Sequence, residues 1–147
     1  MSTKSIKQKS VSNFDINSFL KSLILLLKPR VMSLVIFTCA VGYITSNSTI
    51  ETINAIVGII LVAIGAGAAG CLNMWYDSDI DALMTRTCLR PIPTGKITRN
   101  YALVYGLALT VLSVILLNYF TNLLSAALLL FTILFYILVY TIWLKRK

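Results

Sequence analysis

The chain has 147 residues, of which 58% are hydrophobic and only 12% are charged. These fractions exclude an ordinary soluble domain and predict an integral membrane protein of the all-α class, embedded in a lipid bilayer. Thirteen basic residues against five acidic ones give a net charge of +8. In a soluble protein that excess would suggest a nucleic-acid partner. Here the positions of the basic residues around apolar segments explain it better, so we expect no nucleic acid.

The histidine and cysteine content narrows the chemistry further. Histidine is absent, and Cys39, Cys71 and Cys88 stand singly, without paired spacing. This pattern argues against a zinc site, a disulfide framework and ligation of haem iron by histidine. We interpret the three cysteines as packing residues or free thiols.

In chain order, we expect a polar tail over residues 1–22 and a membrane domain over residues 23–147. A short apolar patch at 23–27 precedes Lys28-Pro29-Arg30 and either lies along the membrane interface or extends the next helix through a kink. Apolar segments of about 20 residues are long enough to cross a bilayer. We predict four transmembrane helices, at about 31–50, 54–76, 101–120 and 121–143. The last two are separated by so short a polar break that they should form an antiparallel hairpin.

The distribution of basic residues predicts the topology. Six lie in the N-terminal region, four in the loop after the second span and three in the C-terminal tail, whereas the other two loops have none. Cytoplasmic segments carry such an excess, so we expect both termini and the loop at residues 77–100 in the cytoplasm. A mitochondrial presequence would be rich in arginine, and no arginine precedes Arg30. A bacterial inner-membrane protein is the simpler interpretation.

The second predicted span contains a segment, residues 64–71, that is unusually rich in glycine and alanine. Small side chains let neighbouring helices approach closely, so tight helix packing is the favoured interpretation. The alternative interpretation is functional, namely that the small side chains leave room for a substrate.

Three of the five acidic residues, Asp77, Asp79 and Asp81, follow that span directly. Residues four apart share a helical face, so Asn73, Asp77 and Asp81 should form one column, while Asp79 points elsewhere and is the weaker candidate. Two carboxylates and an amide, without histidine or thiolate, favour a hard, hydrated divalent cation of the Mg²⁺ type. The alternative is a solvated acidic helix end flanked by arginines.

Basic residues downstream supply the complementary half of such a site. Arg86, Arg90 and Lys96 lie within the polar loop and could hold the phosphate oxygens that a metal leaves free. Column and loop together predict a clamp for a diphosphate.

The motif resembles a known family. Asn73-x-x-x-Asp77-x-x-x-Asp81, Met84-x-Arg86-Thr87-x-x-Arg90-Pro91 and Gly95 are similar to the first aspartate-rich motif of the UbiA-type intramembrane prenyltransferases. Within that family, the segments Asn73-Met-Trp-Tyr-Asp-x-Asp-Ile-Asp81 and Arg86-Thr-x-x-Arg-Pro91 are most similar to the haem O synthase branch. Lys28-Pro29-Arg30 and Tyr140-Thr-x-Trp-Leu-Lys-Arg146 also resemble that branch.

The resemblance implies a fold and a reaction. The fold would be about half of the family's helical bundle, and the reaction would transfer a farnesyl group from farnesyl diphosphate to the 2-vinyl group of protoheme IX, with Mg²⁺ as cofactor. No side chain would act as a nucleophile, because the acceptor supplies the electrons. The implied metal ligands are Asn73, Asp77 and Asp81, and the implied diphosphate ligands are Arg86, Arg90 and Lys96.

Five further residues are secondary candidates: Asp79, Lys28, Arg30, Tyr140 and Lys145. The resemblance places Tyr140 and Lys145 at a helix end beside the active cavity. Lys28, Arg30 and Lys145 also have a simpler interpretation as topology signals.

The sequence departs from the family pattern in one respect. Members of the family are about twice as long and carry a second aspartate-rich motif, which this chain lacks. We therefore expect a truncated or split enzyme that needs a C-terminal half in trans. The sequence also fits a prenyltransferase with an aromatic quinone precursor as acceptor, a non-enzymatic four-helix membrane subunit, or an inactive fragment.

Overall fold

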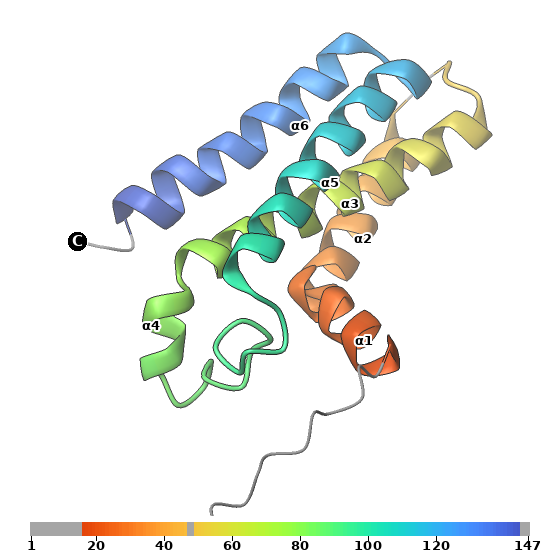
Figure 1. Cartoon of the computed structure of the whole chain (residues 1–147). Coiled ribbons are helices and arrows are strands. Elements are labelled where there is room, and N and C mark those ends of the chain that lie inside the picture. The colour runs from red at the N-terminus through yellow and green to blue at the C-terminus, as the bar shows by residue number, and fades with distance from the viewer. Residues whose placement is uncertain (1–15, 47–48, 145–147) are drawn as a thin grey trace, which may run out of the picture.

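The computed structural model describes residues 16–46 and 49–144, and within these ranges it contains helices and no strands. The elements are α1 (Ile16–Leu26), α2 (Pro29–Thr45), α3 (Thr52–Tyr76), α4 (Ser78–Leu83), α5 (Arg99–Phe120), α6 (Leu123–Phe135) and the π-helix η1 (Tyr136–Leu144). Figure 1 shows α3, α5 and α6 as three long, side-by-side helices. The all-helical class predicted from composition is therefore confirmed for the described part of the chain.

Helix α3 is the centre of the bundle, because it contacts every other helix that the structure describes. Its glycines allow this close packing. A Cβ atom at Gly65 would lie 3.0 Å from both Cδ atoms of Leu129 in α6, and one at Gly67 would lie 3.1 Å from Cβ of Leu27. Tight packing, the favoured interpretation of the glycine and alanine segment, is thus observed.

Helices α5 and α6 form the predicted antiparallel hairpin (Figure 1). Asn122 is the N-cap of α6, and its Oδ1 atom accepts a hydrogen bond of 2.7 Å from the backbone N–H of Ser125. Thr98 caps α5 in the same way, because its hydroxyl accepts from the N–H of Tyr101 at 3.3 Å. Both caps satisfy backbone donors that a helix leaves unpaired at its start.

A kink joins α1 to α2, which is one of the two outcomes expected for the apolar patch at 23–27. Lys28 has a left-handed backbone with φ 52° and ψ 67°, and Pro29 begins α2. The two helices are bent by 51° at this break. The left-handed conformation is uncommon for a residue with a Cβ atom, so the surrounding contacts must hold Lys28 in place.

Among the residues that the structure describes, three helices are long and apolar enough to cross a membrane, namely α3, α5 and the continuous pair of α6 and η1. The bent pair of α1 and α2 would be a fourth if it crosses as one span. The first span was predicted at 31–50, but α2 ends at Thr45 and is only 17 residues long. The chain is therefore a membrane protein whose described part has three or four candidate spans, and the fourth span stays a prediction.

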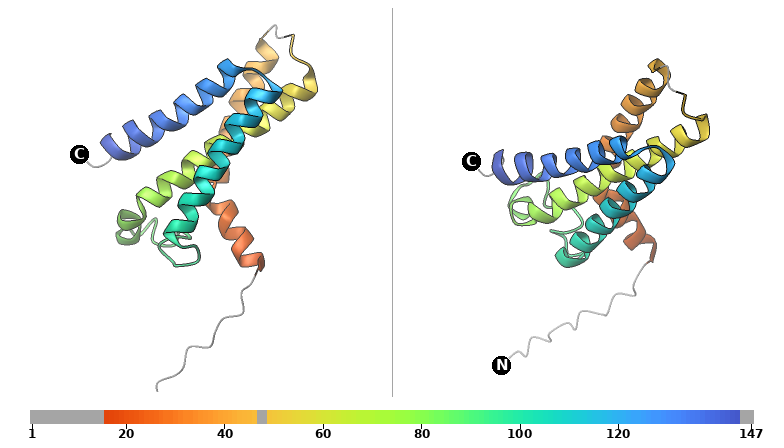
Figure 2. Two further views of the ribbon diagram at one scale, coloured as in Figure 1. Left: turned by 45° about the horizontal axis from the view of Figure 1, so that its top comes forward. Right: turned by 90° about the horizontal axis from the view of Figure 1, so that it is seen from above.

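The polar stretch 77–100 folds back against the bundle. After α4 it continues in turns that place Ile92 and Ile97 in a buried cluster with Leu26, Met74 and Ala102. Both views in Figure 2 show α4 and this loop at the same end of the bundle as the end of η1. The charged residues of the loop are thus held close to the ends of α3 and η1.

Candidate functional site

The acidic column spans the junction of α3 and α4. The backbone N–H of Asp77 donates to the carbonyl of Asn73 at 3.0 Å, and that of Asp81 donates to the carbonyl of Asp77 at 2.8 Å. Because the helical bonding pattern continues across the junction, the side chains four residues apart stay on one face. Asn73, Asp77 and Asp81 are only 3%, 0% and 2% exposed, whereas Asp79 is exposed. Burial of the column requires a compensating positive charge.

Asn73 lies at the centre of a hydrogen-bond network that joins α3, η1, the junction of α3 and α4, and the kink. Its Oδ1 atom accepts from Nζ of Lys28 at 2.8 Å. Its Nδ2 atom donates to Oδ2 of Asp77 at 2.9 Å and to Oγ1 of Thr141 at 3.1 Å. Lys28 is therefore more than a topology signal, because its ammonium group is held at the column.

Asp81 is neutralised by the loop. Its Oδ2 atom lies 2.6 Å from NH1 of Arg90, an ion pair in which the carboxylate is buried and the arginine partly exposed. Thr87 adds a hydrogen bond of 3.0 Å from its hydroxyl to the backbone carbonyl of Asp81. Removal of one partner from such a pair leaves a buried charge without compensation, so these contacts tie the loop to α4.

A basic cleft of about 450 Å³ opens beside the column. Four cationic side chains line it: Lys28, Arg30, Arg86 and Arg90. Arg86 and Arg90 are thus brought together as the sequence pattern suggested, and they are joined by the two basic residues of the kink. Lys96 is exposed and is not among the residues that line the cleft.

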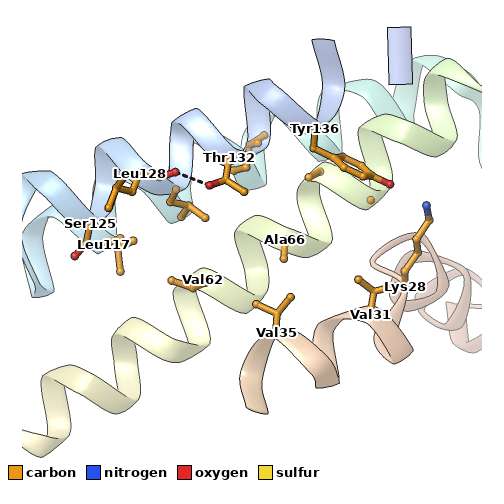
Figure 3. A pocket seen from close by; sticks show the side chains of 14 residues that line it. Lys28, Val31, Val35, Val62, Ala66, Leu117, Ser125, Leu128, Thr132 and Tyr136 are labelled. Carbon is orange, nitrogen blue, oxygen red and sulfur yellow. Dashed lines mark hydrogen bonds between the residues drawn. The ribbon is translucent and has the colours of Figure 1, made fainter. Parts of the chain in front are cut away.

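An apolar cavity of about 520 Å³ runs between α2, α3 and α6. Figure 3 shows Lys28 and Tyr136 at one end and Leu117 and Ser125 at the other, with valines and Ala66 between them. Lys28 and Val31 line both this cavity and the basic cleft. The glycine and alanine segment contributes Ala66, Ala69 and Gly70 to the wall, so it provides room as well as tight packing.

The end of the last helix differs from expectation. Tyr140 is 49% exposed and stacks on Tyr136, with ring centroids 5.2 Å apart. Tyr136 lines the cavity, and Thr141 rather than Tyr140 contacts the column. Lys145 lies outside the described residues. Sequence reasoning missed Thr141 and Tyr136, because the pattern gave no sign that the helix changes from α to π geometry.

The donor set fits a divalent cation that brings other ligands with it. The column offers two buried carboxylates and a buried amide, and all of their candidate ligand atoms are oxygen, as Mg²⁺ prefers. Within residues 16–46 and 49–144, no group of three or more His, Cys, Asp or Glu side chains could hold a metal ion. The remaining positions would therefore fall to phosphate oxygens and water.

Comparison with known proteins gives the family and the relatives of this chain. The sequence matches the UbiA prenyltransferase family over residues 34–147. It is 60% identical over 147 residues to the "Protoheme IX farnesyltransferase" of Pelagibacter ubique (strain HTCC1062), covering 100% of this chain and 48% of that protein. It is also 60% identical over 121 residues to the "Protoheme IX farnesyltransferase 2" of Mesorhizobium japonicum, covering 82% of this chain and 38% of that protein.

A third relative, the "Protoheme IX farnesyltransferase" of Methylorubrum populi, is 55% identical over 121 residues, or 82% of this chain and 38% of the relative. The chain thus spans about half or less of the length of these relatives. No solved structure matches the chain. The family match covers most of the residues, and the chain therefore belongs to the UbiA prenyltransferase family.

Proposed function

We propose that these residues form the N-terminal half of an enzyme that transfers the farnesyl group of farnesyl diphosphate to the vinyl group of protoheme IX, giving haem O. The names of the relatives, at 55% to 60% identity, support both substrates. The relatives are about twice as long, so the rest of the active cavity would come from the other half, on the same polypeptide or in trans.

One observation in the structure carries the proposal: the basic cleft and the apolar cavity meet at Lys28, beside the acidic column. A substrate that fills both must have a strongly anionic head and a long apolar tail. An allylic diphosphate with a farnesyl chain has this form. Apolar walls with few polar groups are typical of such ligand cavities.

The proposed mechanism assigns each residue a separate task. Asp77 and Asp81, with Asn73, would hold the cation, which we propose to be Mg²⁺; when bound, it stabilises negative charge on the leaving diphosphate. Arg86, Arg90 and the two kink residues, Lys28 and Arg30, would bind phosphate oxygens through charge-assisted hydrogen bonds. We assign Lys96, outside the cleft, a smaller contribution.

The apolar walls of the cavity have a role in the chemical steps. As the bond between the allylic carbon and the diphosphate oxygen breaks, the apolar walls would exclude water, which would otherwise capture the carbocation. The electron pair of the vinyl group then forms the new carbon–carbon bond, which leaves a carbocation on the vinyl carbon next to the porphyrin ring. Water adds to that carbon and loses a proton, which gives the hydroxyethylfarnesyl group of haem O, while diphosphate leaves with the electron pair of the broken bond. No nucleophilic side chain is needed for these steps.

We further propose that the described helices, with the bent pair α1 and α2 counted as one span, form half of the family's bundle in the inner membrane of a bacterium. The motif loop and both termini would lie on the cytoplasmic side. The basic residues of the kink and loop support this orientation.

The experiment is a farnesylation assay. Membranes containing residues 1–147 receive haem, farnesyl diphosphate and Mg²⁺, with and without the C-terminal half of a full-length relative. We expect haem O in the presence of that half. Absence of haem O in both reactions, while the intact relative produces it in parallel, would contradict the proposal. A parallel reaction contains 4-hydroxybenzoate, an aromatic quinone precursor, in place of haem. Prenylation of this compound and not of haem would show that the acceptor is the quinone precursor.

A further inference from the structure

Thr141 connects η1 to the acidic column. It is fully buried, and its Oγ1 atom accepts a hydrogen bond of 3.1 Å from Nδ2 of Asn73. The same hydroxyl donates to the backbone carbonyl of Tyr136 at 3.1 Å. The orientation of the hydroxyl is therefore fixed, because its proton is directed at the backbone carbonyl of Tyr136 and one of its lone pairs is directed at Asn73.

The π-helix places Thr141 in this position. Ile133 of α6 is buried against the bundle. In an uninterrupted α-helix the residue on the same face about two turns later would be Tyr140, seven positions further on. Each π-helical bond spans five residues rather than four, so every turn of η1 holds about one residue more. The position that faces the bundle therefore shifts by one residue along the chain, from Tyr140 to Thr141. Accordingly Tyr140 is 49% exposed and Thr141 is 0% exposed.

The contacts of the Asn73 amide show what Thr141 controls. The amide oxygen faces the ammonium of Lys28, and one amide proton faces Oδ2 of Asp77. A reversed amide would place its oxygen against a carboxylate and its protons against an ammonium group. The amide group is planar, so its two protons move together, and rotation of this plane about the Cβ–Cγ bond is the remaining degree of freedom; the hydrogen bond to Thr141 fixes it. Without that acceptor, the plane would rotate and bring the second N–H toward the nearest oxygen atoms.

We propose that Thr141 is a positioning residue that keeps the second amide proton of Asn73 away from the carboxylate of Asp77. That proton then does not compete with the divalent cation for the carboxylate oxygens of Asp77. This role rests on the proposed function, because it assigns the cation to the column. Residues that orient ligands typically change metal affinity by about 10-fold to 100-fold when they are replaced.

The first test measures Mn²⁺ binding by electron paramagnetic resonance, with the chain of residues 1–147 in lipid nanodiscs and inorganic pyrophosphate present. Thr141→Val keeps the shape of the side chain but removes its hydroxyl. We expect about 10-fold weaker Mn²⁺ binding for Thr141→Val and wild-type binding for Thr141→Ser. Thr110→Val is the matched control, because Thr110 is also buried but its hydroxyl donates to its own helix, at the carbonyl of Gly106.

If wild type binds Mn²⁺, equally tight binding in Thr141→Val would overturn the inference. So would an equal loss in Thr110→Val, since the effect would then follow from any missing buried hydroxyl. Failure of Thr141→Ser to restore binding would also contradict a role for the hydroxyl.

A second measurement separates the inference from the proposed function. Hydrogen exchange of the Asn73 side-chain amide, followed by ¹⁵N nuclear magnetic resonance, reports the hydrogen bond without any cation. We expect at least about 10-fold faster exchange in Thr141→Val than in wild type and in Thr110→Val. Equal exchange rates would overturn the positioning role. If wild type binds no Mn²⁺ but the exchange rates differ, the proposed function fails while the positioning of Asn73 by Thr141 stands.

Discussion

Individual charged side chains near the motif differ in their positions relative to the basic cleft, and the sequence alone does not show this difference. Arg30 and Lys96 are both exposed basic residues near the motif, but only Arg30 lines the basic cleft. The position of Lys96 in the motif loop suggested the larger role for that residue. The structure favours Arg30, because the kink brings it to the cleft from another helix.

We predict that Arg30→Gln weakens binding of farnesyl diphosphate by about tenfold, since one charge-assisted hydrogen bond to phosphate is lost. Lys96→Gln is the matched control, with an expected change of less than about twofold. Equilibrium binding of a radiolabelled substrate to nanodisc preparations measures both. A larger effect of Lys96→Gln than of Arg30→Gln would contradict the assignment of the cleft.

Residue spacing alone predicted which side chains of the acidic column share a face, but not which residues contact them. Spacing of four placed Asn73, Asp77 and Asp81 on one face, and the structure buries these three and exposes Asp79. Their roles as ligands stay a prediction. The partners of the column could not be predicted, because Lys28 and Thr141 are 45 and 68 residues from Asn73 in the chain. Contacts over such separations depend on tertiary packing rather than on local pattern.

Helix packing depends on a few small residues whose neighbours the sequence does not reveal. A Cβ atom at Gly106 would lie 2.8 Å from Cδ2 of Leu72, a separation shorter than real contacts allow. Gly42 has no other atom within 4 Å of such a position. Both glycines lie within helices, so they form a matched pair.

We predict that Gly106→Ala destabilises the bundle by about 1–3 kcal/mol, because Leu72 must move out of a filled space between α3 and α5. Gly42→Ala should leave stability unchanged or raise it by up to about 1 kcal/mol, since alanine favours the helix. Unfolding of detergent-solubilised protein by increasing mole fractions of SDS measures both. Equal destabilisation by the two substitutions would show that α3 and α5 do not pack as described.

The ends of the elements were the least predictable part of the fold. Apolar length correctly indicated helices at 54–76, 101–120 and 121–143, which the structure has as α3, α5 and the pair of α6 and η1. The first predicted span at 31–50 was displaced, since the chain bends at Lys28 and α2 ends at Thr45. A left-handed lysine and a π-helix leave no periodic signal, so neither could be predicted from hydropathy.

In the whole molecule, the apolar cavity and the basic cleft are built from α1, α2, α3, α5, α6, η1 and the motif loop, and they meet at the kink. If the cavity holds the prenyl tail, a large side chain in its wall should affect the tail and leave the anionic head unaffected. Ala66 of α3 lines the cavity (Figure 3), whereas Ile60 of the same helix is 53% exposed and does not line it.

We predict that Ala66→Phe weakens binding of farnesyl diphosphate by about tenfold or more and leaves binding of inorganic pyrophosphate unchanged, because apolar contact area of the tail is lost. Ile60→Phe should change neither. Competition binding with the two ligands makes the comparison. Equal losses for both ligands in Ala66→Phe would indicate a general disturbance of the fold and contradict a tail in this cavity.

The proposed function requires a divalent cation and a diphosphate to meet at the buried face of the acidic column. The most direct measurement is Mg²⁺-dependent binding of farnesyl diphosphate to residues 1–147 in nanodiscs, for wild type and for Asp77→Asn, Asp81→Asn and Asp79→Asn. We predict binding that requires Mg²⁺, losses of at least about tenfold for the first two variants and less than about twofold for Asp79→Asn. Equal effects of all three substitutions, or wild-type binding that does not depend on Mg²⁺, would contradict this function.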